Sequence, residues 1–185
     1  MAFLMLVVSI SQDSIDLLES QTWYYARLEN VSTLCNELRK DDNKVSQMPL
    51  GIFSAWAWSR AFGTSEVALR SLNLLWAAIA LAALALAGRQ LSIPWLPALF
   101  AIQPFVWFSM NAARTPVMEM AGGSLLLLGT VGCLRRKPGD GLAGIALCLG
   151  AILLSGASIQ GLMPLLAVLT GLTANGLWNL SLIHI

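Results

Sequence analysis

The sequence lacks most of the side chains that proteins use to bind metals or to build a histidine-dependent active site. Its single histidine, His184, is the penultimate residue, and its three cysteines (35, 133 and 148) show no CxxC or metal-ligand spacing. A catalytic histidine and a zinc site are therefore not expected. Cys133 and Cys148 lie in apolar stretches, so we expect them to be small core residues.

Charge is also scarce. Only 11% of the residues are charged and 57% are hydrophobic, whereas a soluble domain has roughly a quarter charged residues. The net charge is +1, and the basic residues form no cluster beyond Arg135-Arg136-Lys137. The composition therefore does not support nucleic acid binding, and the mean hydropathy of +0.70 predicts a membrane protein.

The sequence contains several long apolar stretches with few charged residues. A helix needs about 20 mostly apolar residues to cross the ~30 Å hydrocarbon layer. The runs do not alternate as membrane barrel strands do, and backbone groups in lipid must be satisfied internally. We therefore predict an all-α, multi-pass transmembrane bundle with five to six membrane segments within 48–180. The candidate segments are 71–88, 94–110, 115–134, 141–157 and 161–178, together with the shorter 48–63.

The acidic residues gather in one polar block, residues 11–47, which holds seven of the ten. Residues 1–10 before it are predicted to end a first transmembrane helix, with a cleavable signal as the alternative. Apolar residues between Asp13 and Leu38 recur at near-helical spacing, which predicts one amphipathic helix resting on the membrane surface. We expect a single membrane domain over 1–185, with 11–47 as an extracytoplasmic loop.

Several residues mark helix boundaries. Pro49 is at a favoured helix-start position, and Thr64-Ser65-Glu66 has the pattern of a helix N-cap. Pro104 should kink the segment 94–110. If the basic triplet 135–137 is cytoplasmic, the polar block lies outside only when segment 48–63 does not cross. The charge pattern leaves this topology open.

Four motifs follow one another in residues 17–116. They are LLESQTWYYARL at 17–28; Met48-Pro49-Leu50; Phe62-Gly63-Thr64-Ser65-Glu66 with Arg70, followed by Gly88-Arg89; and SMNAARTP at 109–116. In this order they resemble the N-terminal module of the GT-C membrane glycosyltransferases, which include protein O-mannosyltransferases and aminoarabinose transferases. The chain departs from the family pattern where Leu18 replaces an Asp, Met48 a Pro and Ala112 a Glu. Family members are longer, so we expect a truncated chain, with 181–185 as a non-native tail.

The resemblance implies transfer of a sugar from a polyprenyl-phosphate donor to an acceptor, on the extracytoplasmic side of a bacterial inner membrane. A carboxylate must take the proton of the attacking hydroxyl. Cationic groups, with or without a divalent metal, must stabilise the phosphate leaving group. Glu19 is the predicted base and Asp16, one turn earlier, its substitute. The predicted substrate-binding residues are Lys44, Arg70, Arg114 and Glu119.

Other interpretations stay open at this level. Glu119 and Arg114 could form a structural ion pair, because a charge within an apolar segment tends to face a partner. The chain could also be a non-catalytic multi-pass membrane protein, either half of a transporter or a scaffold, or an inactive fragment of an enzyme. A transporter favours repeats and broken helices near mid-membrane. The sequence shows no repeat, which favours the enzyme family. No cofactor is required by the sequence.

Overall fold

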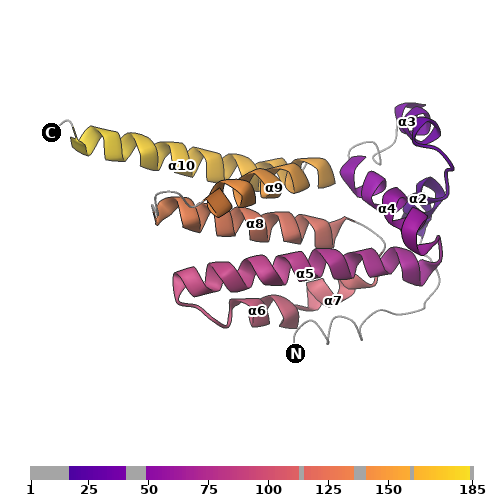
Figure 1. Ribbon diagram of the computed structural model, residues 1–185, viewed down its shortest axis with the longest axis horizontal. Helices are drawn as coiled ribbons and strands as arrows, with labels where there is room; N and C mark the ends of the chain where they lie inside the picture. Colours follow the sequence, from indigo (N-terminus) through magenta and orange to yellow (C-terminus); the bar gives the residue numbers. More distant parts are fainter. Residues whose placement is uncertain (1–16, 41–48, 113–114, 136–140, 159–160, 184–185) are drawn as a thin grey trace.

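The computed structural model describes residues 17–40, 49–112, 115–135, 141–158 and 161–183, and within these residues it contains helices and turns but no strand (Figure 1). The predicted all-α class is confirmed for this part of the chain. Two helices, α5 and α8, are long and apolar enough to cross a membrane. The helices are α2 (Leu17–Ala26), α3 (Val31–Lys40), α4 (Pro49–Phe62), α5 (Glu66–Leu91), α6 (Leu96–Ile102), α7 (Pro104–Met110), α8 (Pro116–Leu134), α9 (Gly141–Ala157) and α10 (Leu162–Ile183).

The apolar helices form a layered bundle. Figure 1 shows α8 between α5 and α9, with α10 beside α9, while α6 and α7 run back along α5. One buried cluster joins α5, α7 and α8 through Ala77, Val106, Met110 and Val117. A second joins α5, α8 and α9 through small and aliphatic side chains: Ala83, Ala87, Leu128 and Ala146. Small residues at these contacts let the helix backbones approach closely.

Glycines set the closest of these contacts, between α8 and α9. A Cβ at Gly150 would lie 2.8 Å from the carbonyl oxygen of Gly122, and a Cβ at Gly132 would lie 2.6 Å from the Cβ of Ala143. No side chain larger than hydrogen fits there without displacing the partner helix. A Cβ at Gly122 would lie 3.0 Å from Cγ of Leu154, whereas a Cβ at Gly123 would have nothing within 4 Å.

The predicted helix starts are confirmed. Pro49 is the first residue of α4. Ser65 is the N-cap of α5, and its hydroxyl accepts a hydrogen bond from the amide of Ala68 at 3.2 Å. Glu66 follows in the first turn, where a negative charge interacts favourably with the helix dipole.

The prediction of a single surface helix between Asp13 and Leu38 is wrong for residues 17–38, the part that the structure describes. The chain forms two ten-residue helices, α2 and α3, separated by a turn at 27–30. Hydrophobic spacing continues across the break, so periodicity alone could not detect it. Tyr25 of α2 is buried with Leu34 of α3 and Ile52 of α4, so the two helices pack against α4.

Segment 94–110 is not one continuous helix either. It divides into α6 and α7 at Gln103, whose ψ of 124° is extended. Pro104 causes more than the predicted kink, because proline lacks the N–H and disfavours the helical conformation of the residue before it. Each seven-residue helix is only about 10 Å long. Cys133 and Cys148 are exposed, so the expectation that they are core residues is also wrong.

Candidate functional site

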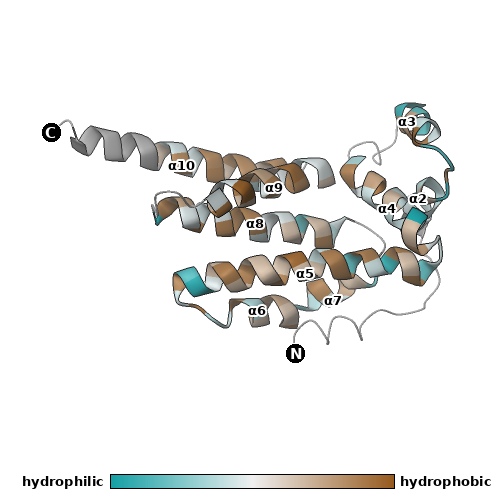
Figure 2. Ribbon diagram, in the orientation of Figure 1, coloured by the Kyte–Doolittle hydropathy of each residue, from teal (hydrophilic) through white to brown (hydrophobic). Residues whose placement is uncertain are grey.

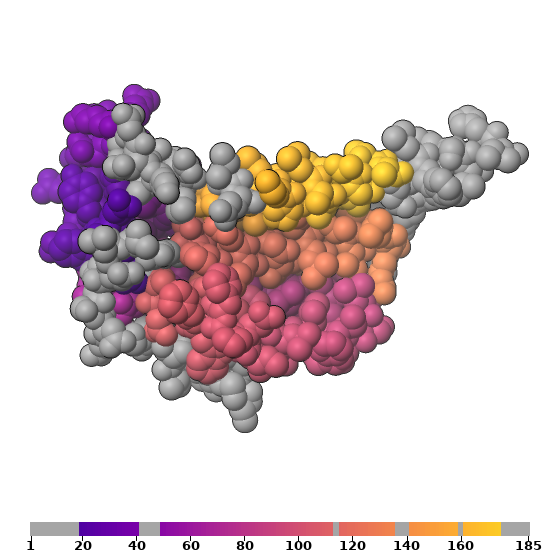
Figure 3. Space-filling model, turned by 180° about the vertical axis from the view of Figure 1, so that it is seen from behind, coloured from indigo at the N-terminus to yellow at the C-terminus, as the bar shows by residue number. Residues whose placement is uncertain are grey.

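Parts of all four motifs meet at one end of the bundle, here called the motif end, which comprises α2, α4, the first two turns of α5 and the turn from α7 to α8. Gly88-Arg89, the last part of the third motif, lies at the other end of α5. Figures 1 and 3 show α2 and α4 at the same end of the molecule from opposite sides. Close contacts tie the segments together. A Cβ at Gly51 would overlap the methyl group of Thr115, and a Cβ at Gly156 would lie 2.7 Å from the Cβ of Leu50. The start of α4 therefore packs against the start of α8 and the end of α9.

A buried ion pair joins the first and third motifs. Arg70 Nη2 donates to Glu19 Oε2 at 3.1 Å, and only 3% of the Arg70 side chain and 4% of the Glu19 side chain are exposed. The two residues are 51 positions apart in the sequence. An isolated buried charge is costly, so each group requires the other in this apolar surrounding. The sequence predicted both residues in the site but not their direct contact.

Helix α2 is held at its other end by α4. The Ser59 hydroxyl donates to the carbonyl oxygen of Ala26 at 2.7 Å, and Arg60 Nη2 donates to that of Leu28 at 2.6 Å. The Trp56 indole donates to the same Leu28 oxygen at 2.7 Å. These donors satisfy carbonyls that the end of α2 leaves free, and the Arg60 charge favours this helix end. Glu19 is thus carried on a helix that is fixed at both ends.

Asn73, one turn after Arg70 on α5, was missed by the sequence analysis. Its Nδ2 group donates to the carbonyl oxygens of Ser109 at 3.2 Å, Met110 at 3.2 Å and Ala112 at 2.7 Å. Two hydrogens are shared among three acceptors, which end α7 and begin the turn to α8. Arg70 and Asn73, both buried, therefore attach the first and fourth motifs to the same stretch of α5.

The remaining predicted site residues are not brought into this cluster by any described contact. Asp16, Lys44 and Arg114 lie outside the described residues. Glu119 lies half-buried in the first turn of α8, where its charge suits the helix dipole. Among the described residues its carboxylate has no hydrogen bond or ion pair, and its predicted pairing with Arg114 stays a prediction.

No group of three or more histidine, cysteine, aspartate or glutamate side chains within the described residues could hold a metal ion. Comparisons with family models, curated proteins and solved structures found no match to this chain. A carboxylate and a guanidinium, placed together by separate helices, offer an acceptor for a proton and a donor for a phosphate.

Proposed function

We propose that this chain is the N-terminal part of a multi-pass membrane glycosyltransferase of the GT-C type, which transfers a sugar from a polyprenyl-phosphate donor to an acceptor at the extracytoplasmic surface. The observation that carries the proposal is the contact between Glu19 and Arg70. The acid of one family-like motif and the arginine of another meet, although nothing in their sequence spacing requires it. Proteins of this composition rarely bury a charge without a functional reason.

The surface of the bundle supports the membrane part of the proposal. Large apolar side chains point outward along most helices from α5 to α10, far more than the scattered exposed residues of a soluble monomer. A soluble protein would have to hide this surface, whereas lipid tails cover it without cost. On α9 and α10 they are Leu142, Ile145, Leu149, Ile152, Leu162, Met163, Leu166 and Leu169.

The chemistry assigns different roles to the two partners. Glu19 takes the proton of the attacking acceptor hydroxyl, and Arg70 binds the donor phosphate as negative charge develops on it. A phosphate and a carboxylate present the same oxygen geometry to a guanidinium. The donor phosphate therefore replaces Glu19 on Arg70 and frees the carboxylate for the acceptor. Since the pair is buried, the end of α2 has to move from α5 when the donor binds.

A non-catalytic membrane scaffold is the second candidate, and one observation favours it. The ion pair is almost fully inaccessible, which suits a contact that only fastens α2 to α5. In that case both charges could be replaced by apolar side chains of similar volume without loss of function.

Glu19→Gln distinguishes the enzyme from the scaffold when it is compared with a matched control at Glu37. It should abolish release of polyprenyl phosphate from a polyprenyl-phosphate hexose or pentose in vesicles, while donor binding through Arg70, measured by native mass spectrometry, persists. It also leaves Arg70 buried without its charged partner, so the free energy of unfolding should fall by about 3–5 kcal/mol. Glu37→Gln makes the same change in the exposed pair with Lys40 on α3, and should leave turnover unchanged.

The double variant Glu19→Met with Arg70→Met tests whether the site is more than a structural contact. Its stability should be close to that of the parent because no buried charge is left unpaired. Donor binding should nevertheless be lost with the guanidinium. A stable double variant that still binds the donor would show that the pair is structural and that the site has been misplaced.

A further inference from the structure

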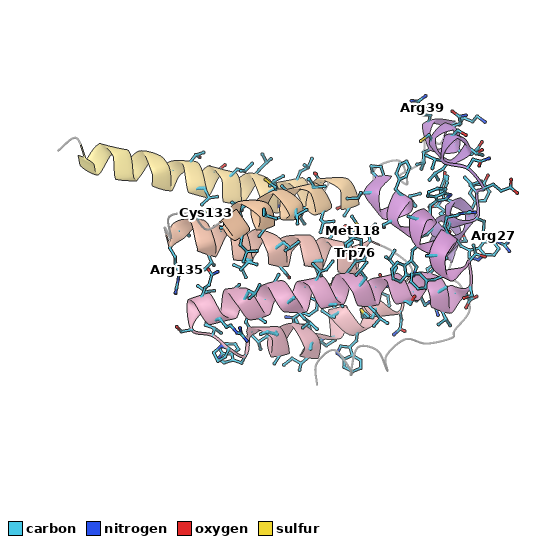
Figure 4. The ribbon with its side chains drawn as sticks, in the orientation of Figure 1. Arg27, Arg39, Trp76, Met118, Cys133 and Arg135 are labelled. Atoms are coloured by element: carbon cyan, nitrogen blue, oxygen red, sulfur yellow. The ribbon has the colours of Figure 1, made fainter. Side chains whose placement is uncertain are left out.

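The two ends of the bundle differ in charge. At the end opposite the motif end, here called the basic end, Arg89 lies in the last turn of α5 and Arg135 follows α8, and both are exposed. Figure 2 shows the hydrophilic end of α5 there, and Figure 4 labels Arg135 at that end and Arg27 and Arg39 at the other. Because α5 and α8 both run from the motif end to the basic end, the two ends face opposite sides of a membrane that these helices cross.

Helix α4 begins and ends at the motif end. Its first turn contacts the start of α8 and the end of α9 through Gly51 and Leu50. Its last residue, Phe62, is followed after a short turn by Ser65, the N-cap of α5. A helix that crossed the membrane would have one end at the basic end instead. At 14 residues, α4 is also only about 21 Å long, short of the ~30 Å hydrocarbon layer.

The side chains of α4 suit the boundary between water and lipid. Two of its polar side chains, Ser59 and Arg60, donate to carbonyl oxygens at the end of α2 and in the turn that follows it. At its last turn the rings of Trp58 and Phe62 lie 4.2 Å apart, and the Trp58 indole donates to the carbonyl oxygen of Ala68 at 2.9 Å. Phe62 is exposed, as is Val67 in the first turn of α5. An indole with a satisfied N–H beside exposed apolar side chains is typical of the headgroup level.

We propose that α4 lies in the headgroup layer of the bilayer at the motif end and does not cross it, with Phe62, Trp58 and Val67 as its anchor. The described residues 17–40 and 49–65 then lie on the extracytoplasmic side, and the basic end with Arg89 and Arg135 faces the cytoplasm. The inference rests only on the membrane part of the proposed function and is independent of sugar transfer.

Cysteine labelling in intact bacterial cells tests this arrangement. The native Cys35, Cys133 and Cys148 are changed to serine, and single cysteines replace Pro49, Phe62 or Arg135, which are all exposed. A membrane-impermeant maleimide should label positions 49 and 62 in intact cells and position 135 only after permeabilisation. Labelling of 49 and 62 from opposite sides would show that α4 crosses. The proposal would also be overturned if position 135 were labelled in intact cells together with positions 49 and 62. It would equally be overturned if positions 49 and 62 stayed unlabelled even after permeabilisation, or if the chain were found in the soluble fraction.

A depth measurement keeps the test independent of changes at the ends of α4. Ala57 is exposed in the middle of α4, and Ile152 is exposed in α9. In vesicles, a spin label at position 57 should collide mainly with a water-soluble nickel chelate, and a label at position 152 mainly with oxygen. Equal, oxygen-dominated collision rates at both positions would place α4 in the hydrocarbon and overturn the proposal. A sugar-transfer assay that fails while this pattern holds would contradict the proposed enzyme and leave the position of α4 intact.

Discussion

The Glu19/Arg70 pair determines how firmly α2 is attached to the bundle. Moving each charge out of water costs several kcal/mol, and their attraction compensates only when both partners are in place. Arg70 belongs to the long helix α5, whereas Glu19 belongs to the short helix α2. Detaching α2 at this point therefore separates two buried charges at once. Only a ligand that supplies a replacement anion lowers this cost, and a donor phosphate is such an anion.

We expect the Asn73 side chain to contribute measurably to the free energy of unfolding. Asn73→Ala removes the donor that three carbonyls at the end of α7 share, and should reduce the free energy of unfolding by about 2 kcal/mol. Unfolding in mixed micelles followed by circular dichroism measures this change. Asn36→Ala on the exposed side of α3 is the matched control and should change the stability little. Equal effects at both positions would show that the Asn73 amide does not hold the turn.

At the scale of single residues, the sequence made Glu19 and Arg70 candidate site residues but did not predict their contact. A glutamate in the polar block and an arginine next to an apolar run are each compatible with an ordinary, solvent-exposed charge. No local sequence rule relates two residues that are 51 positions apart. Asn73, in contrast, could have been recognised from the sequence. A lone amide inside the apolar run 71–88 must find hydrogen-bond partners within the protein.

At the scale of elements, helices whose ends have local causes were predicted well. Proline at the start of α4 and the Ser65 cap of α5 act within one turn. The break between α2 and α3 could not be predicted, because the donors that bind the last carbonyls of α2, Ser59 and Arg60, come from α4. The separation of α6 from α7 had a local cause, Pro104, whose effect was predicted too weakly.

The α8/α9 contact leads to a prediction at the element scale. Gly150→Ala places a methyl group 2.8 Å from both the Gly122 oxygen and the Leu126 nitrogen, and should destabilise the bundle by about 1–3 kcal/mol. Gly144→Ala on the same helix has nothing within 4 Å, and should be neutral or stabilising by up to ~1 kcal/mol. Thermal unfolding of both variants in detergent checks the difference. A Gly150 variant as stable as the Gly144 variant would contradict the close packing of α8 on α9.

At the scale of the whole molecule, the arrangement separates two kinds of surface. The layer of α2, α3 and α4, with the turn at 27–30, carries three of the five described acidic residues, Glu19, Glu29 and Glu37. Large apolar side chains are exposed on α6, α7, α9 and α10, and Figure 2 colours the described residues of these helices mainly as hydrophobic. This separation is what a bilayer requires of a protein with one water-facing end. The sequence predicted it from composition, but the position of α4 became visible only through its contacts with α8 and α9.

Ile152→Lys tests the membrane surface because the two possible environments predict opposite results. Ile152 is exposed within α9. In a soluble protein a lysine at an exposed helix position changes stability by no more than about 0.5 kcal/mol and improves solubility. In the middle of a bilayer it costs about 2.5–3.5 kcal/mol of insertion free energy, so the variant should accumulate less in the membrane fraction and resist alkaline extraction less well than the parent. Val31→Lys, an exposed change on α3, is the control and should leave fractionation unchanged. If Ile152→Lys moved the chain into a stable, soluble form, α9 would face water and the proposed bundle would not be a membrane domain.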